Sequence, residues 1–167
     1  MSSVLLSVEN AVVDLPTPRG NLRAVDHVDL AVGAGRTLGI VGESGCGKTM
    51  LSRAILQLLP KKAKLSGRVM FDGQDLTRLS AEKLRKLRGR SLAVVFQDPM
   101  TSLNPVRRIG AQLAEVAVHH QGMTRREATA RAVDRLDAVS IPDPAQRARQ
   151  YPHEFSGGMR QRAMIGM

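Results

Sequence analysis

The feature that most constrains this chain is a glycine-rich segment between a short apolar run and a predicted helix. Residues 42–49 read G-E-S-G-C-G-K-T, which fits the pattern G-x-x-x-x-G-K-[S/T]. The apolar run 37–41 before it is typical of a buried strand, and residues 49–59 after it predict a helix that Pro60 ends. A strand, a glycine loop and a helix in this order predict an α/β fold.

The glycine loop predicts a phosphate-binding site. Its glycines let backbone N–H groups curl inward as a nest for an anion, and the following helix adds its positive end. Lys48 would reach the β- and γ-phosphates of a nucleotide, and the Thr49 hydroxyl would bind Mg²⁺. Cys46 is interpreted as a small filler of the loop rather than a nucleophile. The residues predicted to hold the nucleotide are Gly42, Glu43, Ser44, Gly45, Cys46, Gly47, Lys48 and Thr49.

Length and composition are those of a globular domain. The chain has 167 residues, 43% of them hydrophobic and 24% charged, which fits one domain with an ordinary core. Aromatic residues make up only 2%, so a stacking platform for single-stranded nucleic acid is not expected. The single cysteine excludes a disulfide framework or a multi-cysteine metal site. We expect neither a signal peptide nor a membrane-spanning segment. The single cysteine fits a reducing compartment.

The remaining pattern predicts an α/β region followed by a helical insert. Residues 25–32 and 68–71 read as strands, residues 92–96 as a second buried strand, and residues 81–88 as a helix capped by Ser80. Beyond residue 105 the apolar period becomes helical, and Thr124 with Glu127 forms a capping box for a helix to about residue 139. Residues 157–167 read as the opening turns of a further helix.

Positive charge is uneven along the chain. The net charge is +10, and residues 61–90 contain ten Lys or Arg against three Asp or Glu. A solvated surface is one interpretation of this run. A phosphate-rich partner or an acidic membrane surface is the other.

Two longer strings carry a family resemblance. Residues 95–105 read V-F-Q-D-P-M-T-S-L-N-P, and residues 151–162 read Y-P-H-E-F-S-G-G-M-R-Q-R. With the glycine loop, they make the chain resemble the ATP-binding subunit of ABC transporters, most closely the oligopeptide and dipeptide importer branch, which also carries nickel. The resemblance covers Val4 to Met167.

The resemblance implies a P-loop NTPase fold of the ABC type. It comprises a RecA-like core, an antiparallel β subdomain and a helical subdomain. Residues 1–104 would form the β subdomain and P-loop core, residues 105–155 the helical subdomain, and residues 156–167 the start of the signature helix.

The resemblance also implies roles for residues outside the glycine loop. Gln97 matches the glutamine that binds Mg²⁺ and senses the transmembrane subunit, so Thr49 and Gln97 would be the metal ligands. Ser156, Gly157 and Gly158 match the signature motif, which closes over the γ-phosphate of ATP held by an opposite subunit. The implied cofactors are ATP and Mg²⁺.

Partners and location follow from the same resemblance. The implied partners are a second, identical or different, ATP-binding subunit, transmembrane permease subunits in contact with the helical insert, and, indirectly, an extracytoplasmic solute-binding protein. Nucleic acid is not expected. The implied place is the cytoplasmic face of the plasma (inner) membrane, as a peripheral subunit.

The sequence departs from the family pattern in several places. Leu15 stands where an aromatic residue usually stacks on adenine, and Phe155 and Met159 replace the Leu and Gln common in the wider superfamily. The apolar strand closed by Asp-Glu, the D-loop and the switch histidine are not found, so no catalytic residue is assigned. We therefore expect a C-terminally incomplete subunit that binds Mg-ATP better than it hydrolyses it. The four histidines show no metal-binding spacing; they are His27, His119, His120 and His153.

Three other functions remain open at this point. A non-catalytic regulatory protein would bind ATP without releasing phosphate, even beside an intact partner. A soluble nucleic-acid-associated ATPase of the same superfamily would bind RNA in a salt-dependent way. A small-molecule kinase shares the glycine loop, but residues 155–162 argue against it.

Overall fold

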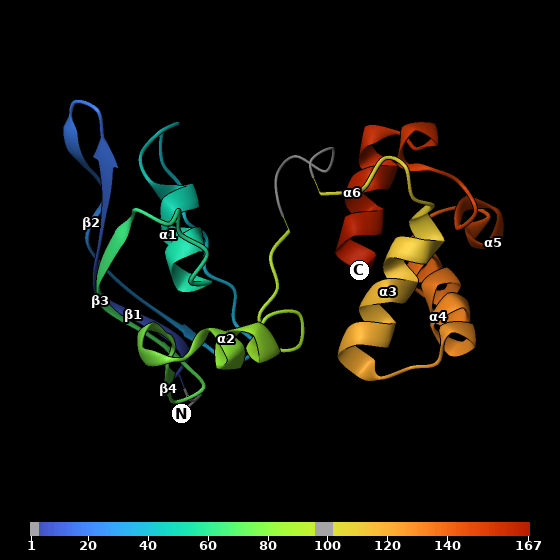
Figure 1. The fold of residues 1–167 in the computed structure, drawn as a ribbon, viewed down its shortest axis with the longest axis horizontal. Coiled ribbons are helices and arrows are strands. Elements are labelled where there is room, and N and C mark those ends of the chain that lie inside the picture. Colours follow the sequence, from blue (N-terminus) through green and yellow to red (C-terminus); the bar gives the residue numbers. More distant parts are fainter. Residues whose placement is uncertain (1–3, 96–101) are drawn as a thin grey trace. The chain divides into compact units, whose positions relative to one another are not determined.

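The computed structural model describes residues 4–95 and 102–167. The chain divides into two compact units, Met1–Arg88 and Gly89–Met167, here called the N-terminal and the C-terminal unit (Figure 1). Each unit has its own packed interior and is described by itself.

The N-terminal unit is built on a four-stranded antiparallel sheet. Strands β1 (Val4–Thr17) and β2 (Gly20–Gly33) form a hairpin, β3 (Lys64–Phe71) pairs with the other edge of β1, and the short β4 (Gln74–Asp75) pairs with β3. The strand order is therefore β2-β1-β3-β4. Buried valines of β1, β2 and β3 close the interior, because β-branched side chains suit a half-buried pleated surface. Val8 and Val13 of β1 and Val69 of β3 are fully buried, and Val25 of β2 is 5% exposed.

Helix α1 (Lys48–Ile55) contacts β1 and β2 and buries Leu51 and Ala54. The helix ends one turn before the residue-59 limit predicted from the sequence, because Gln57 adopts a left-handed conformation with φ of 54°. After β4 come a 3-10 turn, η1 (Leu76–Arg78), and helix α2 (Ala81–Leu87). The predicted cap of α2 is confirmed, since Ser80 Oγ accepts a hydrogen bond from Lys83 N.

Both predicted buried strands are wrong in the described part of the chain. Residues 37–41 and 92–95 contain no regular strand, apart from an isolated bridge at Leu92. Apart from the half-buried Leu92, their apolar side chains are exposed: Val41 is 94% exposed and Val95 50%. An apolar run becomes a buried strand only where neighbouring strands pair with its N–H and C=O groups. The described sheet contains only β1 to β4 and offers these runs no such partner.

The C-terminal unit is helical. Helices α3 (Ile109–Gln121) and α4 (Arg125–Ala138) pack side by side, and α6 (Gly157–Gly166) contacts α4 (Figure 1). The short α5 (Pro144–Arg147) and the 3-10 turn η2 (Pro152–Glu154) connect α4 to α6. One apolar cluster joins these elements: Leu103, Ile109, Leu113, Ala132, Leu136, Ile141, Phe155 and Ala163.

Local signals in the sequence placed these helices correctly. The capping box at α4 is confirmed: Thr124 Oγ1 accepts from Glu127 N at 3.4 Å, and the Glu127 carboxylate accepts from Thr124 N at 2.9 Å. His119 and His120 occupy the last turn of α3. Among the residues that the structure describes, no helix is both long and apolar enough to cross a membrane.

Candidate functional site

The glycine loop is a tight segment that rests directly on strand β2. Gly45 and Gly47 have φ of 85° and 92°, a region that glycine adopts without the steric cost a Cβ would bring. A Cβ on Gly47 would stand 2.1 Å from the carbonyl oxygen of Ala24 in β2. Only glycine permits this approach, so Gly47 fixes the loop against the sheet at the point where α1 begins.

Cys46 packs against the first residues of the loop. A Cβ on Gly42 would stand 2.7 Å from Cys46 Sγ, and Cys46 N donates to the carbonyl oxygen of Glu43 at 3.3 Å. These contacts support the interpretation of Cys46 as a filler that shapes the loop, although its thiol is free and exposed.

Lys48 is held with its ammonium group inside the curve of the loop. Its Nζ donates to the carbonyl oxygens of Gly42 and Glu43 at 2.8 and 2.6 Å. Cys46 Sγ lies 3.4 Å from the same nitrogen. The positive charge thus sits beside the backbone of the loop rather than in bulk solvent, which is the arrangement an entering phosphate would meet.

The N-terminus of α1 adds further donors. Gly47 is the N-cap, and no described side chain caps the helix; the first intrahelical bond runs from Leu51 N to the Gly47 carbonyl. The N–H groups of the first turn therefore have no intrahelical acceptor, and they form the positive end of the helix dipole. No acidic side chain occupies this turn. An anion at this place would accept hydrogen bonds from these N–H groups and would meet a favourable positive charge.

A Mg-nucleotide is compatible with this donor set. Thr49, in the first turn of α1, is exposed and offers a hydroxyl oxygen as a ligand. The described residues contain no cluster of three or more His, Cys, Asp or Glu that could hold a metal ion. Mg²⁺ commonly keeps waters and binds through one or two protein groups plus substrate phosphates, so a single hydroxyl beside the loop suits it.

The sequence analysis also singled out residues outside the glycine loop. Gln97 lies outside the described residues, so its predicted role is untested. Leu15 lies within β1, opposite Leu22 of β2, and it is half-buried. Ser156, Gly157 and Gly158 belong to the C-terminal unit.

Ser156 begins α6 in the way the sequence predicts. Its Oγ accepts a hydrogen bond from Met159 N at 3.2 Å, and its carbonyl oxygen accepts from Arg160 N at 2.9 Å. Ser156, Gly157 and Gly158 are exposed, and a Cβ on either glycine would meet nothing within 4 Å. The buried Phe155 anchors this end of α6 in the apolar cluster. The helix start is therefore an open tip that a ligand can approach closely.

The sequence analysis missed one group that shapes this tip. The Glu154 carboxylate accepts a hydrogen bond from Tyr151 N at 2.7 Å, and the rings of Tyr151 and His153 stack with centroids 5.7 Å apart. These contacts fix the turn η2 immediately before Ser156. The three-residue spacing from Tyr151 to Glu154 was the available signal, because a carboxylate at that distance can return to a backbone N–H.

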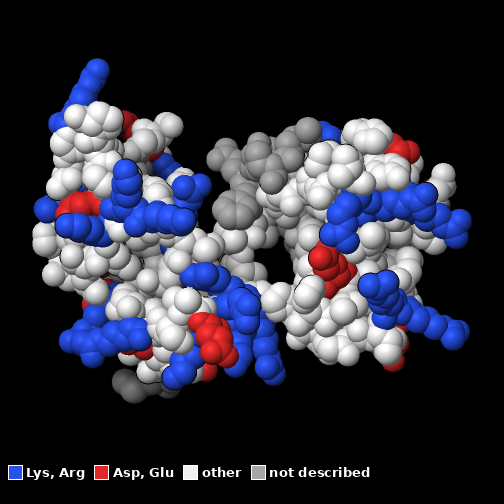
Figure 2. All heavy atoms as spheres, viewed as in Figure 1, with Lys and Arg blue, Asp and Glu red and all other residues white. Residues whose placement is uncertain are grey.

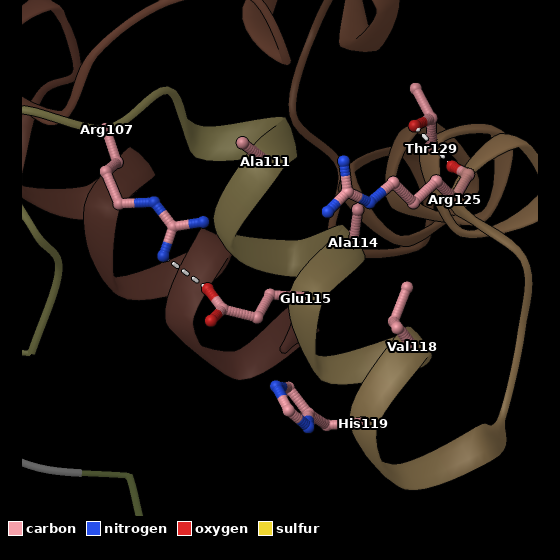
Figure 3. A pocket seen from close by; sticks show the side chains of 8 residues that line it. All are labelled: Arg107, Ala111, Ala114, Glu115, Val118, His119, Arg125 and Thr129. Carbon is pink, nitrogen blue, oxygen red and sulfur yellow. Dashed lines mark hydrogen bonds and ion pairs between the residues drawn. The ribbon is translucent and has the colours of Figure 1, made fainter.

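A hollow of about 420 Å³ lies between α3 and α4 in the C-terminal unit. Figure 3 shows Ala111, Ala114 and Val118 along α3 between charged groups, with the guanidinium of Arg107 paired with the Glu115 carboxylate. The described lining residues contain no nucleophile beside a base and no paired carboxylates. The hollow thus carries no catalytic arrangement, and the glycine loop remains the candidate site.

Comparisons with known proteins show which protein family the chain belongs to. The family profile of ABC transporters matches residues 25–167. The chain therefore belongs to the ABC transporter family, which confirms the resemblance seen in the sequence.

Within this family the chain is similar to ATP-binding proteins of peptide transport. The chain is 46% identical over 166 residues to the "Oligopeptide transport ATP-binding protein OppD" of Salmonella typhimurium, covering 99% of this chain and 50% of that protein. It is 46% identical over 165 residues to the "Dipeptide transport ATP-binding protein DppD" of Bacillus subtilis, covering 98% of this chain and 49% of that protein. The chain spans about half the length of the curated relatives it matches.

A solved structure confirms the fold class. The structure titled "Dimeric structure of a post-hydrolysis state of the ATP-binding cassette MJ0796 bound to ADP and Pi" superposes with a TM-score of 0.85 at 24% identity, covering 97% of this chain and 68% of that chain. At this identity the likeness concerns the fold alone. The predicted α/β fold of the ABC type is therefore confirmed.

Proposed function

We propose that this chain is the ATP-binding, energy-coupling part of an ABC importer for peptides or similar small solutes. It binds Mg-ATP through residues 42–49, with Lys48 on the β- and γ-phosphates and Thr49 on Mg²⁺. The observation that carries the proposal is the position of Lys48 Nζ, within 2.8 Å of two loop carbonyls, beside a helix start that no described side chain caps. The names of its OppD and DppD relatives support the solute class.

The proposal includes a head-to-tail pair of ATP-binding subunits. The open tip at Ser156 supports this part, because its two following glycines leave room for a phosphate from a neighbouring molecule. Gln97 would complete the Mg²⁺ site. Closure of the pair on ATP would shift permease subunits between conformations, at the cytoplasmic face of the membrane. A solute-binding protein would take part indirectly.

The test is equilibrium binding of ATP in the presence of Mg²⁺, measured by isothermal titration calorimetry. Lys48→Ala removes the ammonium group from the loop, and hydrogen bonds to charged groups are worth about 1.5–3 kcal/mol, so we expect a roughly 10- to 150-fold loss of affinity. Lys64→Ala is the matched control, since it removes the same charge from an exposed position on β3. Equal affinities of wild type and Lys48→Ala would refute the assigned role.

A further inference from the structure

Two basic segments of the N-terminal unit are exposed and have no part in the glycine loop. Lys61 and Lys62 form the tip of a turn closed by a hydrogen bond from Ala63 N to the Pro60 carbonyl at 2.9 Å. Helix α2 contributes three more basic residues around the buried Leu84. We call these five exposed residues the basic face: Lys61, Lys62, Lys83, Arg85 and Lys86.

Arg88 brings the two segments together. It follows the last turn of α2, and its guanidinium donates to the carbonyl oxygens of Leu56 and Gln57 at 2.9 and 2.5 Å. These carbonyls end α1, where the helix dipole favours a cation. The end of α2 is thereby attached to the segment that leads into Lys61 and Lys62, which ties both basic segments to the same part of the N-terminal unit.

The charge of the basic face is largely uncompensated. Glu82 is the only carboxylate within residues 53–62 and 81–88, and it pairs with Lys86 at 2.8 Å. In the described part of the chain the other four basic residues form no ion pair. Figure 2 shows Lys and Arg side chains gathered around α2. The surface thus carries about four free positive charges, the range in which clusters of Lys and Arg bind acidic membranes.

We propose that the basic face docks on the acidic phospholipid headgroups of a bilayer. Leu58 lies three residues before Lys61 and is 39% exposed, which gives the surface an apolar side chain that can enter the headgroup region. Residues 53–62 and 81–88 contain no aromatic side chain on which a base could stack, which favours lipid over single-stranded nucleic acid. The inference rests on the proposed function, since that function places the chain beside a membrane.

The test is cosedimentation of the chain with vesicles of mixed phosphatidylglycerol and phosphatidylcholine, compared with pure phosphatidylcholine. We expect binding to the acidic vesicles only, weakening as salt rises. The double variant K61Q/K62Q removes two charges from the turn, and at about 1 kcal/mol per cation we expect an about 30-fold loss of vesicle affinity. These side chains are exposed in a turn, so folding does not depend on them.

The matched control is R125Q/R126Q, which lowers the net charge from +10 to +8 as K61Q/K62Q does, but on exposed residues of α4. We expect it to keep vesicle affinity within about twofold of wild type. Three outcomes would each overturn the proposal. They are an equal loss of vesicle affinity in both variants, a lack of binding to acidic vesicles at low salt, and displacement of the chain from vesicles by single-stranded RNA of equal phosphate content. Lys48→Ala separates the two hypotheses: it should lose ATP and keep the vesicles, so each can fail alone.

Discussion

Gly47 offers the sharpest test of how the loop is built, because Gly45 is its natural control. Both have left-handed backbones, with φ of 92° and 85°. They differ in their surroundings: a Cβ on Gly47 would stand 2.1 Å from the Ala24 carbonyl oxygen, whereas a Cβ on Gly45 would meet nothing within 4 Å. Replacing each by alanine therefore imposes similar backbone strain on both but a steric overlap only on Gly47.

The expected magnitudes follow from this difference. Left-handed strain on alanine costs roughly 1–2 kcal/mol, and the reduced entropy of the unfolded chain returns roughly 0.4–1 kcal/mol. Gly45→Ala should therefore lower the free energy of unfolding by about 0–1.6 kcal/mol. Gly47→Ala adds an overlap with backbone, for which overpacking costs of about 1–3 kcal/mol apply. The gap between the two variants should be about 1–3 kcal/mol, since the shared contributions cancel.

Urea unfolding of both variants measures the gap, and ATP titration of the same samples measures its consequence for the site. We expect Gly47→Ala to lose more nucleotide affinity than Gly45→Ala, because relief of the overlap moves the start of α1 away from β2. Equal stabilities of the two variants would show that Gly47 does not lie against Ala24, and the description of the loop would be wrong.

Three further predictions concern other contacts. Thr124→Ala should cost about 1 kcal/mol by chemical denaturation. Hydrogen bonds from the Thr124 hydroxyl and, to a smaller extent, from its N–H lower the pKa of Glu127. The stability that this cap adds is therefore present at neutral pH and is lost as the pH falls through that lowered pKa. If Thr124→Ala and wild type lost stability in the same way as the pH falls, this reasoning would be contradicted. Gly110→Ala should cost about 1–3 kcal/mol, because the new Cβ would stand 2.7 Å from the Ala148 carbonyl oxygen; a neutral melting temperature would refute it. Arg88→Ala should lower the free energy of unfolding, measured in urea, by about 1–3 kcal/mol, because it leaves two carbonyls at the end of α1 without their donor. A variant as stable as wild type would count against that contact.

Local sequence signals predicted a large part of the fold. Ser80, Thr124 and Ser156 each cap a helix as expected, because a cap joins a side chain to an N–H only three residues away. The glycine loop was also predictable, since its left-handed turns depend on glycine at fixed places. The roles of Gln97 and of the signature glycines remain predictions.

Long-range contacts decided the rest. The runs 37–41 and 92–95 have the composition of buried strands, yet they stay exposed, because strand formation depends on partners that no local pattern supplies. The contact of Gly47 with Ala24 and the bonds from Arg88 to the end of α1 join residues more than twenty positions apart. The sequence alone thus determined which residues turn the chain, cap its helices and can meet a phosphate. Only the tertiary structure decided which surfaces those residues face, because such contacts depend on chain segments that are distant in sequence.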